Sequence, residues 1–224
     1  MFDDTNSKVG VISSKVAITQ KQSLYFLTKR AFDFLFAIIA LINLSPVFLI
    51  ICILIKAESR GPAIFKQKRV GKDGKIFTFY KFRSMYTDCD QGIHQRHVEK
   101  VISGQTCMSK VKDDPRITKI GHFLRATIMD ELPQLFNVIK GEMSMIGPRP
   151  HPCYEVENYK DWHRERLEIL PGITGLWQIN KWSYETYDEA IQIDINYVRN
   201  VSFTLDFKIF FKTVLLFITP RVKI

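Results

Sequence analysis

The sequence has few cysteines, and no two of them lie close together in the chain. Its four cysteines among 224 residues lack any spacing typical of a zinc site or of a disulfide-rich small domain, so reduced thiols are expected. Internal repeats and low-complexity segments are also lacking. His94 and His97 form the one close histidine pair, and without a second cluster of ligands they indicate a solvated helix face more than a metal site.

The first 21 residues contain no apolar run and therefore do not resemble a secretory signal. With 46% hydrophobic residues and 25% charged residues, the chain is neither a disordered tail nor a polytopic membrane protein. What it does have is a formal net charge of +9. An excess of this size favours a polyanionic partner, which leaves nucleic acid, an anionic membrane surface and a phosphorylated substrate open.

One long apolar run, from Ala31 to Ile55, contains a single charged residue, Asp33. A straight helix of that length would reach roughly 37 Å, which is enough to cross a bilayer core. Ser45 and Pro46 interrupt it, however, and basic residues flank both of its ends. A kinked helix that enters and leaves the membrane on one side satisfies both observations, while a kinked spanning helix remains the alternative.

The rest of the chain predicts an α+β fold, mostly α, with one small β-hairpin over residues 63–83 around a Gly-Lys-Asp-Gly turn. Residues 86–112 are polar and ambiguous, and are expected to be partly helical. Further helices are predicted over residues 117–125, 133–140, 154–170, 185–200 and 202–218. The last of these places Lys208 and Lys212 on one face among Phe and Leu, which suits either an interfacial helix or a core helix.

Arg125, Asp130 and Glu131 lie close together before Pro133. Because Pro is tolerated in a first helical turn, the acidic pair is expected at or just before a helix start, where free N–H groups favour anions. On one continuous helix Arg125 and Asp130 would point about 140° apart, so a break in the chain is needed to bring them together. Helix capping is the simpler explanation of the acidic pair.

Gly147-Pro148-Arg149-Pro150 cannot form regular structure and fixes one arginine between two prolines. A guanidinium held in this way suits the oriented binding of a phosphate. Together with the acidic pair and the apolar run, Arg149 indicates phosphoryl chemistry at a lipid surface.

Four long motifs carry a family resemblance. FDFLFAIIALINLSPVFLI, FKQKRVGKDGKIFTFYKFRSM, DDPRITKIGHFLRATIMDELPQLFNVIKGEMSMIGPRP and PGITGLWQIN occur in this order. The chain resembles the bacterial sugar transferases, and more narrowly the small monotopic phosphoglycosyl transferases, from about Lys29 to about Phe217. One departure follows the last motif, where Lys181 and Trp182 replace the usual Gly-Arg pair.

The resemblance implies transfer of a sugar-1-phosphate from a UDP-sugar to a polyprenol phosphate, expected to be undecaprenyl phosphate, with release of UMP. By this analogy Asp130 is the nucleophile that forms a covalent phosphosugar-enzyme, and Glu131 holds Mg²⁺. Arg125, Lys81 and Arg149 would bind phosphates, Pro148 and Pro150 would shape the site, and Ser45-Pro46 would break a re-entrant membrane helix. The sugar itself is not implied.

The same resemblance places the protein at the cytoplasmic face of the bacterial inner membrane, on an anionic lipid bilayer, at the first membrane step of glycan synthesis. It implies a flexible leader (1–28), a re-entrant membrane helix (29–58), a compact cytosolic catalytic domain with interfacial helices (59–217) and a tail (218–224). A homodimer stays open. The rival interpretations are a catalytically silent scaffold and a polyanion-binding protein; no helix-turn-helix, RNP or zinc motif supports nucleic-acid binding.

Overall fold

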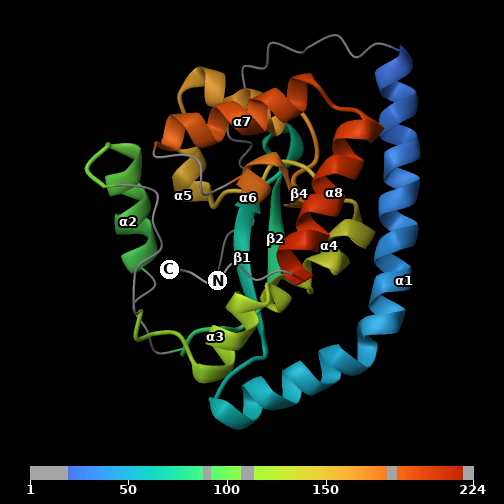
Figure 1. The fold of residues 1–224 in the computed structure, drawn as a ribbon. Coiled ribbons are helices and arrows are strands. Elements are labelled where there is room, and N and C mark those ends of the chain that lie inside the picture. The colour runs from blue at the N-terminus through green and yellow to red at the C-terminus, as the bar shows by residue number, and fades with distance from the viewer. Residues whose placement is uncertain (1–19, 88–91, 107–113, 181–185, 219–224) are drawn as a thin grey trace, which may run out of the picture.

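The computed structural model describes residues 20–87, 92–106, 114–180 and 186–218. The fold is α+β, mostly helical with small sheets, as the sequence predicts. The longest element is α1 (Gln20–Glu58), which has Pro46 in its interior. Figure 1 shows α1 running along one side of the molecule, bending sharply and continuing beneath it. The Ser45 hydroxyl donates to the Ile42 carbonyl at 2.8 Å, so this part of the helix also uses a side-chain bond.

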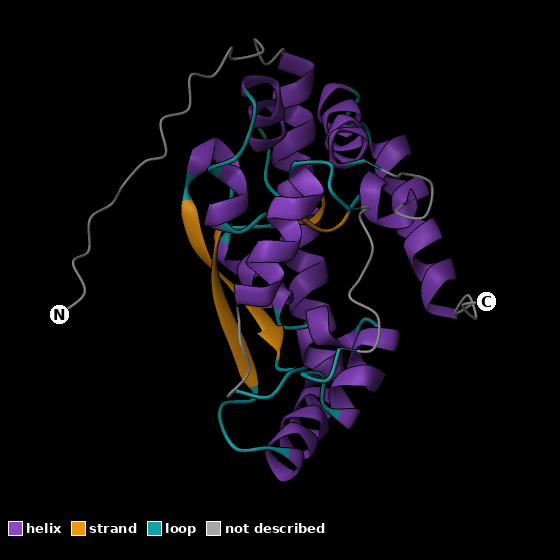
Figure 2. Ribbon diagram, turned by 90° about the vertical axis from the view of Figure 1, so that its left-hand side faces the viewer, coloured by secondary structure: helices purple, strands orange, loops and turns teal. Residues whose placement is uncertain are grey.

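The predicted hairpin is confirmed. Strands β1 (Ile64–Val70) and β2 (Ile76–Phe82) pair antiparallel, with Ile64 opposite Phe82 and Val70 opposite Ile76. The 3-10 turn η1 (Lys72–Gly74) joins them. Figure 2 shows the two strands side by side with helices packed along them. Alternate residues of β2, including Phe77 and Phe79, are buried, which is the pattern of a strand with one face on a core.

Helices α3 (Lys119–Ala126), α4 (Gln134–Lys140), α7 (Tyr187–Arg199) and α8 (Phe203–Ile218) confirm four of the predicted helices within a few residues. A part of the ambiguous 86–112 segment forms α2 (Gly92–Ile102). Gly141 ends α4 in the left-handed conformation, with φ of 83°, as expected of a helix C-terminus. Residues 1–19 of the expected leader, residues 219–224 of the tail and Lys181-Trp182 lie outside the described residues, and so does the side chain of His94. Residues 20–28, expected in the leader, belong to α1.

The helix predicted over residues 154–170 is wrong. The structure has a single turn, α5 (Cys153–Val156), and then the 3-10 helix η3 (Asp161–Leu167), with Lys160 in extended backbone between them. Tyr159 and Arg166 turn inward here and hydrogen-bond to each other. Tertiary contacts of these buried polar side chains therefore override the helical propensity of the segment.

A second small sheet was not predicted. Strands β3 (Ser144–Ile146) and β4 (Gly172–Thr174) pair in parallel, and the short helix α6 (Leu176–Asn180) follows β4. The two segments come very close: a Cβ on Gly172 would lie 2.1 Å from the backbone nitrogen of Gly147. Only glycine allows this approach, which holds the Pro-rich loop after β3 against the chain before β4.

The parts of α1 before and after Pro46 both pack against the same domain. Near its start, Arg30 donates to the carbonyls of Val138 and Ile139 at the end of α4. Near its end, the Ile55 carbonyl accepts from Arg83, and the Glu58 carboxylate accepts from the first N–H groups of α3. Ala37 in the middle is fully buried.

The opposite side of α1 is exposed and apolar. Long enough and apolar enough to cross a membrane, α1 buries only 11% of its most apolar window in the protein. Its exposed large side chains include Leu24, Leu27, Phe32, Leu35, Ile39, Ile42, Leu49 and Ile53. An unburied apolar face of this size indicates association with a membrane.

Candidate active site

The predicted break between Arg125 and Asp130 is present. Helix α3 ends at Ala126, and Ile128 adopts the left-handed conformation with φ of 58°. A β-branched residue rarely adopts this conformation, and such strain often occurs at functional sites. The 3-10 turn η2 (Met129–Glu131) follows directly, so Asp130 and Glu131 lie just before Pro133 and α4, as predicted.

Strand β2 brings the first cation to this turn. The Asn137 amide of α4 bonds to both Thr78 and Tyr80 of β2, which fixes the helix beside the strand. Lys81, the next residue of β2, places Nζ 2.5 Å from Oδ2 of Asp130. Asp130 is 3% exposed, so its carboxylate is buried against a single ammonium partner.

Glu131 is held by a different cation. Nη2 of Arg149 lies 2.8 Å from Oε1 of Glu131, and Lys81 lies at 3.9 Å from the same oxygen. Burial alone would raise the pKa of Glu131, but the charges of Arg149 and Lys81 outweigh it and lower that pKa to about 2. Glu131 is therefore an anion at neutral pH, although its side chain is only 14% exposed.

Arg125 approaches the acidic pair from α3. Its Nε donates to the Ser84 hydroxyl at 2.8 Å, which anchors the guanidinium just beyond the end of β2. Burial lowers the pKa of Arg125, and the nearby charge of Asp130 acts in the opposite direction. The structure thus brings together Lys81, Arg125, Asp130, Glu131 and Arg149, the charged residues selected from the sequence.

Arg69 is a further cation of this site, and no local sequence pattern distinguishes it from the other basic residues of its strand. Its guanidinium lies 3.9 Å from the centre of the Phe79 ring, and its Nη1 donates to the Pro150 carbonyl at 2.7 Å. Burial and the charge of Arg149 lower its pKa to about 9, while Glu131 acts to raise it. In the hairpin register Arg69 lies opposite Phe77, and its guanidinium reaches diagonally to the ring of Phe79, so this contact depends on the pairing of the strands.

Four cations thus lie among three carboxylates. Asp114 and Arg116 lie near Arg125 but neutralise each other through a close ion pair. The cations Lys81, Arg69, Arg125 and Arg149 face Asp130 and Glu131, and Glu155 also acts on Arg69 and Arg149, which leaves an excess of one positive charge. Buried like charges repel one another, so a site built in this way favours an anionic ligand.

The carboxylates also suit one kind of metal ion. Among the described residues, no group of three or more His, Cys, Asp and Glu side chains could enclose a metal. A cation that takes one or two protein carboxylates and completes its shell with phosphate oxygens and water, as Mg²⁺ does, fits Asp130 and Glu131; a tetrahedral zinc cage does not.

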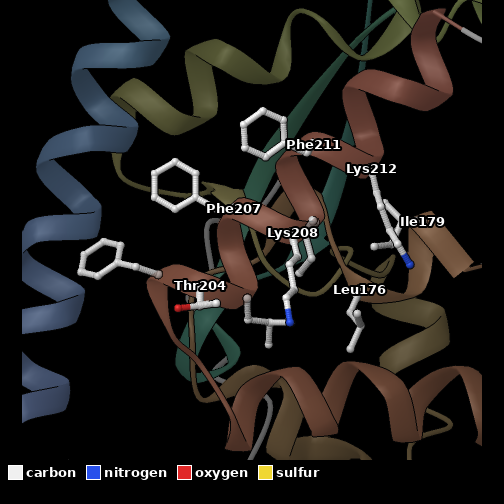
Figure 3. A pocket seen from close by; sticks show the side chains of 10 residues that line it. Leu176, Ile179, Thr204, Phe207, Lys208, Phe211 and Lys212 are labelled. Atoms are coloured by element: carbon white, nitrogen blue, oxygen red, sulfur yellow. The ribbon is translucent and has the colours of Figure 1, made fainter.

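A separate apolar hollow of about 700 Å³ lies over α8 and α6. Figure 3 shows Phe207 and Phe211 projecting from one side of α8, with Lys208 and Lys212 along another side towards Leu176 and Ile179. The two phenylalanines are each 61% exposed. Arranged in this way, α8 presents an apolar stripe flanked by cations.

Fold and site together define an α+β domain, built on one long apolar helix, with a buried acidic pair enclosed by cations. The sequence profile described as "Bacterial sugar transferase" matches residues 24–220, and the chain belongs to that family.

Several curated proteins are similar to most of this chain. The "Galactosyl transferase CpsE" of Streptococcus agalactiae serotype III is 41% identical over 95% of this chain and 48% of its own length. The "UDP-glucose:undecaprenyl-phosphate glucose-1-phosphate transferase" of Klebsiella pneumoniae is 42% identical over 83% of this chain and 39% of its own length. The chain therefore spans less than half of these two relatives. The "Exopolysaccharide production protein ExoY" of Sinorhizobium fredii is 40% identical, with 84% of each chain covered.

Proposed function

We propose that this protein transfers a sugar-1-phosphate from a UDP-sugar to a polyprenol phosphate and releases UMP. The observation that carries this proposal is the buried Asp130, paired with Lys81 inside a group in which cations outnumber carboxylates. The negatively charged diphosphate of a UDP-sugar would be attracted by that excess of positive charge. The names of the relatives, which include glucose-1-phosphate transfer to undecaprenyl phosphate, support the same reaction.

In the first step, an oxygen of Asp130 attacks the β-phosphorus of the donor. The bond from that phosphorus to the oxygen bridging the α-phosphate breaks, and UMP leaves with the electron pair. An aspartate carboxylate can form an acyl phosphate, and the ion pair with Lys81 holds the Asp130 carboxylate in place. Arg125, Lys81, Arg69 and Arg149 offset the charge that develops on the phosphate oxygens.

In the second step, an oxygen of the polyprenol phosphate attacks the same phosphorus. The acyl phosphate bond to Asp130 breaks, the carboxylate is restored, and the polyprenyl-diphosphate-sugar leaves. A covalent intermediate of this kind splits one transfer between two large substrates into two displacements at a single site.

Glu131 and the outer oxygens of the donor would hold Mg²⁺, which supplies charge neutralisation at the diphosphate when bound. Nη2 of Arg149 forms an ion pair with Oε1 of Glu131 at 2.8 Å and so orients the carboxylate. Adjacent side chains diverge along the backbone, so separate roles for Asp130 and Glu131 suit their positions better than one shared role.

For α1 we propose the re-entrant arrangement. Arg30 near its start and Glu58 at its end both bond to the cytosolic domain, to α4 and α3 respectively. A helix that crossed the bilayer would carry its two ends to opposite faces, whereas these contacts need both ends on one face. The bend in Figure 1 and the internal Pro46 provide the geometry.

We also propose that α8 lies in the membrane interface on the cytoplasmic side of the bacterial inner membrane. Phe36 of α1, which is 45% exposed, packs edge-on against Phe210 of α8, so the exposed apolar face of α1 meets α8. Lys208 and Lys212 would reach the anionic headgroups while Phe207 and Phe211 enter the acyl region.

The test is UMP release from a panel of UDP-sugars, with undecaprenyl phosphate and Mg²⁺, in detergent or nanodiscs. Wild type should release UMP with one sugar or a few. Asp130→Asn should abolish release, and the exposed Asp161→Asn is the matched control that should retain it.

Silence of the folded wild type across the panel would reject the transferase and favour a scaffold that keeps the fold. Release that persists in Asp130→Asn would reject this residue as the nucleophile while leaving the reaction in place. A phosphosugar adduct on wild type and its absence from Asp130→Asn, read by intact mass spectrometry before acceptor is added, would support both steps.

A further inference from the structure

Every carbonyl of the Pro148-Arg149-Pro150 loop accepts a hydrogen bond, although the loop has no regular structure. The Pro148 carbonyl accepts from the Gly172 amide at 2.8 Å. The next two carbonyls accept from arginine side chains, the Arg149 carbonyl from Arg166 at 2.8 Å and the Pro150 carbonyl from Arg69 at 2.7 Å. The backbone that presents Arg149 to Glu131 is thus gripped at successive peptide groups.

Arg166 lies behind the site and is 2% exposed. It forms a close ion pair with Asp194 of α7, which is 3% exposed, and donates to the Tyr159 hydroxyl. Its hydrogen bond to the Arg149 carbonyl is the contact that reaches the active-site loop. One guanidinium therefore joins η3, α7 and the loop.

Stability alone is a weak reason for such a pair. Removing two charges from water is costly, and a buried ion pair is often no more stabilising than apolar residues of the same volume. Burial raises the pKa of Asp194 despite its arginine partner, which shows the same cost. The fixed fork of a guanidinium, in contrast, can bind a carboxylate, a hydroxyl and a carbonyl in set directions.

We propose that the Arg166–Asp194 pair is a positioning device for Arg149, acting through the Arg149 carbonyl to hold that guanidinium against Glu131 and the donor phosphates. The catalytic consequence rests on the proposed function; the mechanical one does not. Arg166 itself touches no reacting atom.

The chain offers a matched control. Arg199 and Glu165 form a second arginine–carboxylate pair at 2.6 Å between the same two elements, η3 and α7. This pair lies at the surface, with the Arg199 side chain 58% exposed, and its bonds do not reach the loop. Arg199→Lys therefore removes an equivalent bond between η3 and α7 without loosening the loop.

The first measurement is hydrogen exchange of the full-length protein, followed in the peptide covering residues 143–156. Arg166→Lys keeps the charge but loses the fork, and should speed exchange there several-fold relative to wild type, whereas Arg199→Lys should not. Asp194→Asn, which leaves Arg166 in place without its counter-charge, should produce a smaller increase and serves if Arg166→Lys does not fold. If exchange in this peptide is unchanged in both Arg166→Lys and Asp194→Asn, the inference is overturned, whatever the protein catalyses.

The second measurement is kcat/KM for UMP release in a double-mutant cycle. Arg166→Lys should lower it about 10- to 100-fold, since small displacements of a positioned group have effects of this size. In an Arg149→Lys background the same change should add less than twofold, because the group it positions is already altered. If Arg166→Lys lowered kcat/KM by the same factor in wild type and in the Arg149→Lys variant, the inference would be overturned. If Arg166→Lys altered hydrogen exchange in the loop but the wild type released no UMP, the positioning role would be supported and the proposed function rejected.

Discussion

Two groups of buried carboxylates in this molecule are neutralised in opposite ways. In the active site, Asp130 and Glu131 face cations: Lys81 bonds to the first and Arg149 to the second. In the anchor cluster, formed by Tyr25, Lys29, Asp33, Ser144, Tyr197 and Asp206, the partners are mostly hydroxyls.

The anchor cluster is saturated. Asp206 accepts from Tyr25 at 2.7 Å and from Lys29 at 2.8 Å on one oxygen, and from Tyr197 at 2.7 Å on the other. The Ser144 hydroxyl donates to Asp33 at 2.6 Å. Tyr25, Lys29 and Asp33 thus fix the first half of α1 to α8 and β3, and the Tyr197 bond ties α7 to the same Asp206.

The difference separates a cluster built for stability from one built for a ligand. The carboxylates of the anchor cluster already accept hydrogen bonds from hydroxyls and from Lys29, so a further charged ligand would gain few new interactions there. The active site instead carries more cations than carboxylates, together with a strained Ile128 beside its turn. Repulsion among the like charges of such a site would be reduced by an anionic ligand. The two regions should therefore respond differently to the same Asp→Asn change.

The largest expected effect is on activity. Asp130→Asn should lower the rate of UMP release at least ~10³-fold, because an amide cannot form the acyl phosphate. Its melting temperature should fall by less than that of the corresponding change at Asp206. If Asp130→Asn kept full activity but lost much stability, Asp130 would have a structural role, and the contrast between the two regions would disappear.

The next effect is on stability. Asp206→Asn leaves Lys29 without its nearest counter-charge and weakens two tyrosine bonds, and should reduce the free energy of unfolding by roughly 3 kcal/mol. Thermal unfolding in detergent measures it. The specific activity of the remaining folded protein should stay within a few-fold of wild type; a ~10³-fold loss would show that the anchor cluster takes part in the chemistry.

Glu131 provides a pH-dependent comparison. Its pKa is lowered to about 2 from an ordinary 4.5, so its ion pairs stabilise the folded state fully above pH 4.5. That contribution, about 3 kcal/mol by linkage, is lost as the pH falls from 4.5 towards 2. In Glu131→Gln the matching part of the acid destabilisation should disappear. Equal slopes for the two proteins in denaturant titrations over this range would contradict the assignment.

The smallest effect concerns the far end of α1. Glu58 accepts from the N–H groups of Lys119 and Ile120 at the start of α3. Glu58→Ala should cost about 1 kcal/mol, as the loss of a helix cap does, and Glu58→Gln should recover much of it. A cost as large as that of Asp206→Asn would mean that the two attachments of α1 are equally strong.

Local signals account for what could be predicted. Alternating apolar residues around a Gly-rich turn specify the hairpin, and Pro133 and Gly141 mark the two ends of α4. The α7 helix begins at Thr186, whose side chain accepts from the Glu189 amide. At the candidate site, the types of residue and the end of the helix after Arg125 could be predicted, because both follow from spacing within a few residues.

Longer-range features were not predictable from local pattern. The helix expected over residues 154–170 is broken because Tyr159 and Arg166 are drawn inward to partners on other elements. The pairing of β3 with β4 joins segments with no shared periodicity. Arg69 resembled any other basic residue of an alternating strand until the hairpin placed it over Phe79 and beside Arg149.

By itself, then, the sequence determined the long apolar helix, the short elements and the chemical types at the site, because composition and spacing within one or two turns govern them. The tertiary structure alone decided that Lys81, Arg125, Asp130 and Arg149 form one charged cluster, that both ends of α1 attach to one domain, and that Arg166 bonds to the loop that carries Arg149. These arrangements depend on distances between separate segments, and packing fixes such distances only after the whole chain has folded.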